Sequence, residues 1–271
     1  MSSFRSVNLL DIRPVCLISF ALKTHRRFPL ILVAHRDEYF KRDTAAMHWW
    51  KNEAGDSVVL AGKDNVGGGT WFGVSPSGKW AAVTNYRERH PERPDVLTRG
   101  RLVLDYLIGD AQPAEYLKSV AADSQKYNGF NLLVGKSAEV SWFSNRDPNP
   151  TEPSPLPLGV YGLSNHLLNT DWPKVQLAKQ CLTDRITSDE IEADELVDVL
   201  FDESRPPDEL LPDTGVEPEL EKLLSSMFIE SKSMDYGTRC STAMTISNNG
   251  KFSVAELTYP ERKLAEFTFE T

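Results

Sequence analysis

The sequence VCLISFALKTHRRFPLILVAHRDE, residues 15–38, contains two apolar runs separated by a charged turn. Residues 15–22 and 29–35 have the length and composition of buried β-strands, so this stretch predicts a strand pair. The second run ends in four polar residues, 35–38. Polar side chains at the end of a buried strand are placed where active-site groups often lie. We therefore expect the functional site beside this strand pair.

Strand-like segments lie at both ends of the chain, and helical spacing occupies the middle. Residues 57–88 predict a strand, a glycine loop and a hairpin, and Asn249-Gly250 predicts a further hairpin. Apolar residues at helical spacing predict helices over 98–109, 113–124, 173–186 and 188–201. Two packed sheets covered by helices, an α/β (α+β) fold, follow from this order. We expect one domain, 16–271, preceded by an N-terminal extension, 1–15.

Composition excludes several classes of function. The 271-residue chain is 40% hydrophobic and 25% charged, which is ordinary for a soluble globular protein. Its net charge of −9, without any basic block, argues against nucleic acid or an anionic membrane surface as a partner. No apolar stretch reaches the ~18 residues that span a bilayer, and the first residues lack the apolar segment of a secretory signal. We expect a cytoplasmic protein without a membrane span.

The cysteines are the remaining candidates for chemistry. Cys16, Cys181 and Cys240 are too few and too scattered for a disulfide scaffold or a zinc ribbon. The five histidines show no metal-ligand spacing and no G-x-S-x-G elbow is present, so we expect neither a metal nor an organic cofactor. Cys16 differs from the others because it lies at the start of the first expected strand. The residues alone leave two interpretations open for it, a small buried hydrophobic side chain or a nucleophile.

Seven short motifs follow one another along the chain: Cys16-Leu17, His35-Arg36-Asp37-Glu38, Gly68-Gly69-Thr70-Trp71, Thr84-Asn85-Tyr86-Arg87, Asn128-Gly129-Phe130-Asn131-Leu132, Gly162-Leu163-Ser164-Asn165 and Gly237-Thr238-Arg239. In this order they resemble the motifs of the NRDE-motif family, also called the transport-and-Golgi-organisation family. The resemblance covers nearly the whole chain from Cys16 onward. It implies an N-terminal-nucleophile hydrolase-like fold, a four-layer αββα sandwich of two mainly antiparallel sheets.

The sequence departs from the family pattern in two places. The first residue of the family's Asn-Arg-Asp-Glu motif is His35 here, whereas the next three residues match. Val15 stands where the family has its initiator methionine, and 14 residues precede it. We hypothesise that the true start is residue 15, read as methionine from a GTG codon, and that removal of this methionine exposes Cys16. The rival hypothesis is a propeptide cut between Val15 and Cys16.

An N-terminal cysteine would supply a nucleophile and a base in one residue. Its free α-amine has an unperturbed pKa of about 7.7–8.0 and can accept a proton near neutral pH. The thiolate would attack a carbonyl to form an acyl-enzyme, which water resolves. The arrangement is similar to that of cysteine acylases that open conjugated bile acids and penicillin V. It implies hydrolysis of a non-peptide amide, or a related acyl bond, in a small-molecule substrate.

The acylase pattern of Cys, Arg, Asp, Asn, Asn and Arg is matched in order by six residues, which form the expected catalytic set: Cys16, Arg36, Asp37, Asn85, Asn165 and Arg239. By this resemblance Arg36 would keep the thiol ionised, and Asp37 or Glu38 would orient the α-amine. Asn85 would donate to the oxyanion, a contribution of about 3 kcal/mol. Asn165 and Arg239 would position the substrate or the amine.

Three further residues are expected to contact substrate: Glu38, Trp71 and Tyr86. Each assignment has a structural alternative: the asparagines would end strands, the arginines would form ion pairs with the adjacent acids, and Trp71 would be a core or wall residue. At the level of function, the alternative that the resemblance implies is a non-catalytic carrier or chaperone for a hydrophobic ligand such as haem or an acyl lipid.

Overall fold

The computed structural model describes residues 16–88 and 92–271, so the expected extension 1–15 lies outside the described residues. Its strands form two sheets in which all pairings between the strands below are antiparallel. In order across the first sheet these are β13 (Lys263–Glu270), β12 (Lys251–Thr258), β11 (Tyr236–Ile246), β2 (Leu30–Tyr39), β1 (Cys16–Leu22) and β9 (Gly159–Leu163), with β10 (Glu230–Ser231) paired to β11. The second sheet has the order β3 (Thr44–Lys51), β4 (Ser57–Asp64), β5 (Phe72–Val74), β6 (Lys79–Asn85), β7 (Phe130–Lys136) and β8 (Glu139–Ser144).

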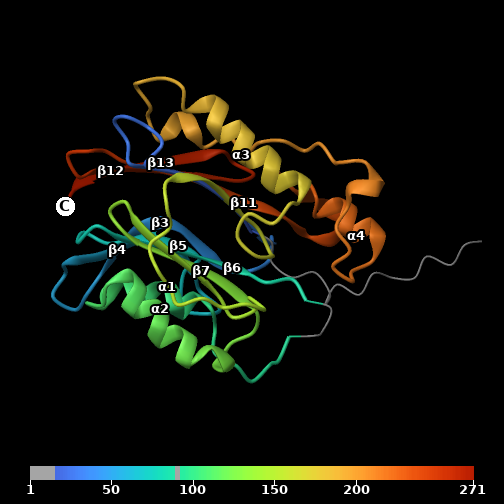
Figure 1. Ribbon diagram of the computed structural model, residues 1–271, viewed down its shortest axis with the longest axis horizontal. Coiled ribbons are helices and arrows are strands. Elements are labelled where there is room, and N and C mark those ends of the chain that lie inside the picture. The colour runs from blue at the N-terminus through green and yellow to red at the C-terminus, as the bar shows by residue number, and fades with distance from the viewer. Residues whose placement is uncertain (1–15, 89–91) are drawn as a thin grey trace, which may run out of the picture.

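Helices cover the outer face of each sheet. α1 (Gly100–Ile108) and α2 (Pro113–Ala122) pack on the second sheet, and α3 (Pro173–Arg185) packs on β1 and β9 of the first. The short α4 (Pro218–Leu223) lies at the end of the molecule near β11 (Figure 1). The layers therefore follow the order helix, sheet, sheet, helix, which confirms the expected αββα sandwich.

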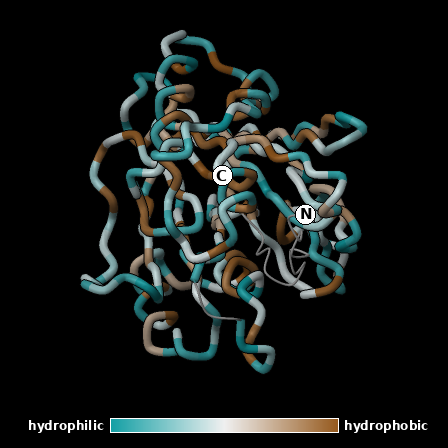
Figure 2. Tube along the Cα trace, turned by 90° about the vertical axis from the view of Figure 1, so that its right-hand side faces the viewer, coloured by the Kyte–Doolittle hydropathy of each residue, from teal (hydrophilic) through white to brown (hydrophobic). Residues whose placement is uncertain are grey.

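The alternation of side chains along β1 explains the layers. Ile18 and Phe20 face the second sheet and join the core between the sheets, whereas Leu17 and Ala21 face α3. β-Strands place successive side chains on opposite faces, so a run that is apolar throughout must be covered on both sides. The hydrophilic segments lie mainly in the peripheral loops (Figure 2).

Several predicted elements are confirmed: the strand pair, the helices near 98–109, 113–124 and 173–186, and the hairpin at Asn249-Gly250, where Gly250 has a φ of 82°. β2 continues to Tyr39, so residues 35–38 lie within the strand rather than after it. The predicted helix over 188–201 is wrong. This segment contains only the 3-10 turn η3 (Asp194–Leu196), and its apolar residues pack on the first sheet from an irregular backbone. Among the described residues, no helix has the length and hydropathy needed to cross a bilayer.

Candidate functional site

The site lies at the start of β1, where this strand pairs with the last residues of β2. Cys16 pairs with Arg36 across the two strands, and both line a cavity of about 560 Å³. Arg36 contacts Trp71 and Glu38 contacts Arg42, both beside the second sheet, whereas His35 contacts the Met227 carbonyl and Asp37 accepts from Thr238 of the neighbouring strand β11. This is the alternation that a continuous strand imposes. Two distinct environments therefore meet at one strand end.

Six of the nine expected site residues line this cavity: Cys16, Arg36, Asp37, Glu38, Trp71 and Asn85. Asn165, Arg239 and Tyr86 do not line it. The cavity also contains residues that the sequence motifs did not indicate, notably Arg42 and Asp64. These two are separated by 22 positions in the chain, so only the pairing of β3 with β4 brings them together.

Trp71 forms the wall opposite Arg36. The guanidinium carbon of Arg36 lies 4.3 Å from the centroid of a Trp71 ring, a favourable cation–π distance. A Cβ atom added to Gly62 would lie 2.2 Å from the Trp71 ring, so the glycine is needed for the ring to pack here. Trp71 is thus held between β4 and Arg36.

Arg36, Glu38, Arg42 and Asp64 form a chain of ion pairs along this wall. The Arg36 and Arg42 guanidinium groups each approach Glu38 at 3.5 Å, and Arg42 donates to both Asp64 oxygens at 3.2 and 2.8 Å. Arg36 Nη1 has no hydrogen-bond partner among the described residues, although it is buried. Arg36 therefore keeps one buried donor available at the cavity.

The glycine loop and the start of α1 form another wall. A Cβ on Gly69 would lie 2.4 Å from the carbonyl carbon of Gly100, and the Thr70 amide donates to the Gly100 carbonyl at 3.3 Å. Gly68 has a φ of 71°, which favours glycine. The Gly-Gly-Thr-Trp motif is thus explained by close backbone packing that carries the chain into Trp71.

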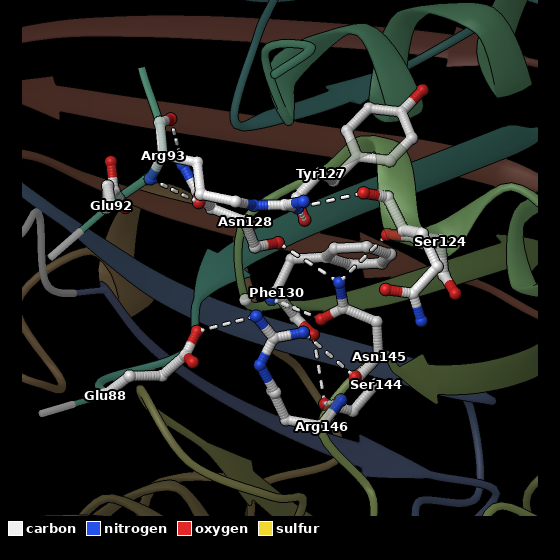
Figure 3. A network of polar contacts seen from close by, with 12 residues as sticks. Glu88, Glu92, Arg93, Ser124, Tyr127, Asn128, Phe130, Ser144, Asn145 and Arg146 are labelled. Carbon is white, nitrogen blue, oxygen red and sulfur yellow. Dashed lines mark hydrogen bonds and ion pairs between the residues drawn. The ribbon is translucent and has the colours of Figure 1, made fainter. Parts of the chain in front are cut away.

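The remaining wall, around Arg93, is fixed by polar contacts shown in Figure 3. The Arg93 amide donates to Asn128 Oδ1 at 2.9 Å, and Asn128 Nδ2 donates to the Arg93 carbonyl at 3.1 Å. The Arg93 guanidinium donates to the carbonyls of Gln125 and Tyr127. These contacts give the Asn128 motif a structural role in holding the cavity wall.

Asp37, the residue after Arg36 on β2, is buried at the edge of the cavity and next to β11. Thr238 donates to Asp37 Oδ1 at 2.7 Å, and Oδ2 has no hydrogen-bond partner among the described residues. Lys174, in the first turn of α3, is 4% exposed and donates to the Leu224 carbonyl at 2.8 Å. Burial raises the pKa of Asp37 to about 7, and burial lowers the pKa of Lys174 to about 7. Lys174 carries no sequence signal, because surface lysines are common in helices.

The thiol of Cys16 is buried in the full chain. Burial, followed by the negative charge of Asp37, raises the pKa of Cys16 to about 12, while the Arg36 charge acts in the opposite direction. Arg36 therefore acts on the thiol pKa in the expected direction, but burial outweighs its effect when residues precede Cys16. The cost of burying a thiolate exceeds the attraction of one neighbouring cation.

The three expected residues outside the cavity contact backbone or other rings. Asn165 donates to the Asn85 carbonyl at 3.0 Å, and its neighbour Ser164 donates to the Cys16 carbonyl at 3.0 Å. Arg239 lies at a bulge in β11 and donates to the carbonyls of Tyr39 and Arg42, at 2.8 and 3.1 Å. Tyr86 packs on His166, with ring centroids 4.9 Å apart.

His35 faces away from the cavity. Its Nδ1 lies 3.0 Å from the Met227 carbonyl, and the ring packs edge-on against Phe228. Burial lowers the pKa of His35 to about 4, so the ring is neutral and donates from Nδ1. The residue that departs from the family motif therefore contacts the segment before β10 rather than the thiol.

Among the described residues, no three His, Cys, Asp or Glu side chains gather as they would around a metal ion. Two antiparallel sheets between helix layers, with Cys16 at the start of an inner strand of the first sheet, define an αββα sandwich fold. The Caenorhabditis elegans N-acylethanolamine-hydrolyzing acid amidase ortholog has this fold, with a TM-score of 0.50, 13% identity, and coverage of 84% of this chain and 92% of that chain.

The chain belongs to the Transport and Golgi organisation 2 family, whose sequence profile matches residues 15–261. It is 34% identical to the mouse Transport and Golgi organization 2 homolog over 275 residues, covering 93% of this chain and 94% of the relative. The bovine homolog is 35% identical over 263 residues, with coverage of 89% and 92%. These comparisons confirm the family predicted from the seven motifs.

Proposed function

We propose that this protein hydrolyses a non-peptide amide, or a related acyl bond, in a form of the chain that begins at Cys16. The observation that carries this proposal is the position of Cys16 on the cavity wall, beside Arg36 and Asp37 and together with Asn85. These are the groups that a thiol nucleophile requires: a cation, a carboxylate and an amide donor.

The α-amine supplies the change in electrostatics that the full chain lacks. When Cys16 is the first residue, its neutral amine can accept the thiol proton, and the ammonium that forms stabilises the thiolate against the effect of burial. Asp37, whose Oδ2 has no hydrogen-bond partner among the described residues, is the acceptor that we assign to this amine. The amine takes the thiol proton and later delivers it to the leaving nitrogen.

The remaining residues act around the reacting carbonyl. Asn85 donates to the oxyanion, and Arg36 stabilises the thiolate while Trp71 bounds the substrate. Asn165 and Arg239 act through the backbone, because the first donates to the Asn85 carbonyl and the second holds the turn after β2. They are positioning residues for Asn85 and for the ion pairs of Arg42.

The likeness to an amidase supports the choice of an amide. The neighbour of similar fold is, by its name, an enzyme that hydrolyses N-acylethanolamines. At 13% identity this likeness concerns the fold, so the ethanolamine portion is not transferred to the present chain.

The test begins with the intact mass and N-terminal sequence of the protein from its native host. A chain that starts at Cys16 is then assayed against acyl p-nitroanilides, with Cys16→Ser and Asn85→Ala variants and Cys181→Ser as the matched control. We expect Asn85→Ala to lower kcat by about 100-fold or more. Retention of residues 1–14 in the native protein, or unchanged hydrolysis by Cys16→Ser, would overturn the proposal.

The burial of Cys16 beside a cavity of about 560 Å³ favours a second candidate, a carrier that binds its ligand in this cavity without catalysis. A protein of this kind binds ligand equally well with Cys16→Ala. Titration of the full chain with haem and with an acyl lipid, followed by absorbance and tryptophan fluorescence, distinguishes it from the enzyme. The cytoplasmic location stays a prediction under both functions.

A further inference from the structure

A second, much smaller hollow adjoins Cys16. Its volume is about 10 Å³, and it shares Cys16, Arg36 and Trp71 with the large cavity. A volume of this size accepts roughly one water-sized probe, which is also the size of a methyl group. Cys16 therefore lines both the large cavity and the small one. We call the small cavity the methyl pit.

The walls of the methyl pit are mainly apolar and come from both sheets. Ile18 and Ala34 belong to β1 and β2, and Phe72 and Ala82 belong to β5 and β6. All four side chains are buried in the core between the sheets. Because they lie in paired strands, the pit cannot widen without moving a sheet.

The large cavity combines charged residues with apolar ones such as Trp71, Val83, Val96 and Leu97. Eight of its lining residues are charged: Arg36, Asp37, Glu38, Arg42, Asp64, Glu92, Arg93 and Arg99. A long alkyl chain placed there would remove water from these groups without replacing its hydrogen bonds, which is unfavourable. An amine carrying acidic and basic groups would find partners of both signs.

We infer that the substrate is an amide whose acyl group is no larger than acetyl and whose amine portion is polar and charged. This inference rests on the proposed function. The acyl methyl occupies the methyl pit while the amine portion lies in the large cavity. The Cys16 thiolate adds to the acetyl carbonyl and the C–N bond breaks. The leaving amine takes the proton that the α-amine received from the thiol. Water then cleaves the thioester, which releases acetate and regenerates the thiol.

The first experiment measures acylation of Cys16 by a size series. Protein produced from the complete gene, and shown by intact mass to begin at Cys16, is mixed with p-nitrophenyl acetate, butyrate and octanoate. Thioester formation is followed by p-nitrophenol release and by mass after acid quenching. Because each methylene in a confined pocket changes selectivity by roughly tenfold or more, we expect acetate to acylate at least about 100-fold faster than butyrate. Nα-acetyl-L-lysine and Nα-octanoyl-L-lysine give the same comparison with a charged amine.

Variants of the pit walls test its location. Ala34→Val fills the pit and is expected to remove the preference for acetate, whereas Ile18→Val removes one methyl group and is expected to improve butyrate relative to acetate. Ala21→Val is the matched control, because Ala21 is buried on the other face of β1 against the α3 layer. It adds the same volume without approaching the pit.

The outcomes separate the two proposals. Acetate preference that Ala34→Val removes and Ala21→Val retains supports the inference. A thioester that forms as fast from octanoate as from acetate overturns the inference and leaves the hydrolase proposal intact. No thioester from any donor, in a chain that begins at Cys16, overturns the hydrolase proposal and the inference with it.

Discussion

The two faces of β2 carry charge in different ways. On the cavity face, Arg36 and Glu38 join a chain of ion pairs whose far end, Arg42 and Asp64, is partly exposed to solvent. On the helix face, His35 is buried against Met227, while Asp37 is buried against Thr238 of β11 and also reaches the cavity. Consecutive residues of the motif 35–38 therefore contact different parts of the structure.

This difference indicates which charged groups are suited to binding a ligand and which stabilise the fold. Partly exposed ion pairs can exchange partners with a ligand at small cost, because water screens them. Buried groups with shifted pKa values are costly to disturb, because each depends on a few fixed partners. We expect substitutions of His35 and of the residues around it to affect stability and those of Arg36, Glu38 and Arg42 to affect binding, whereas Asp37 lies at the boundary of the two environments.

The largest effect is expected on the helix face, from Lys174→Met. The substitution removes the lysine charge that lowers the pKa of Asp37, and it removes the donor to the Leu224 carbonyl. We expect the free energy of unfolding to fall by about 3 kcal/mol at pH 7, where both Lys174 and Asp37 carry part of their charge, measured by urea denaturation. Lys222→Met is the control, since Lys222 forms an exposed pair with Asp208 and should change stability by less than about 0.5 kcal/mol. Equal effects of the two substitutions would remove the distinction between the faces.

Lys174 also shows where sequence reasoning ends. The strands, three helices and the order of the motifs follow from local periodicity and from the family resemblance, because apolar alternation reports burial directly. A buried lysine has no such signal. Its environment depends on α3, α4 and β2 together, and these lie far apart in the chain.

The same limit explains the mixed outcome for the nine expected site residues. Cys16, Arg36 and Asp37 are adjacent because two predicted strands pair, a local event. Arg239 lies outside the cavity because a bulge in β11 shifts its register, which no composition rule indicates. The segment 188–201 has helical spacing but follows the surface of the first sheet, so tertiary packing overrides its pattern.

The next largest effect, on the cavity face, is expected from Gly62→Ala. The new Cβ would meet the Trp71 ring and displace it from Arg36, at a cost of about 2 kcal/mol in unfolding free energy. Gly135→Ala is the matched control, because its Cβ would meet Trp80 at 2.3 Å in the core away from the cavity. Both variants should lose similar stability, while only Gly62→Ala should accelerate alkylation of Cys16 by N-ethylmaleimide. Acceleration in both variants would show that thiol access follows general loosening instead of the Trp71 wall.

A smaller effect with a defined pH dependence is expected from His35→Asn. The pKa of His35 is lowered from 6.5 to about 4, mainly by burial, with Asp198 and Lys174 as charged neighbours. Between these values the unfolded chain binds a proton that the folded chain does not, so the contribution of His35 to stability is lost as the pH falls. Between pH 8 and pH 5.5, the titration of His35 should lower the free energy of unfolding of the wild-type chain by about 1.4 kcal/mol. The Asn variant should not show this loss.

Urea denaturation of the wild-type and His35→Asn chains at pH 8, 6.5 and 5.5 gives this difference directly. The pKa of Asp37 is shifted in the opposite direction, because its value of about 7 in the folded chain lies above the usual value for an aspartate. Its contribution is present in both chains and cancels from the comparison. A difference that stays constant with pH would mean that His35 has the same pKa in the folded and unfolded chains, and the buried environment assigned to its ring would be wrong.

The smallest change in stability is expected from Arg42→Met. The Arg42 side chain is 32% exposed, so its pairs with Glu38 and Asp64 are screened and should contribute about 1 kcal/mol or less. Arg262→Met is the control, because Arg262 contacts both Asp198 oxygens with similar geometry at an exposed site. If the cavity face is built for binding, Arg42→Met should raise KM for a charged amide while leaving stability close to that of the control. A loss of stability near that of Lys174→Met would instead make the cavity ion pairs a part of the structural core, and both faces of β2 would then serve the same purpose.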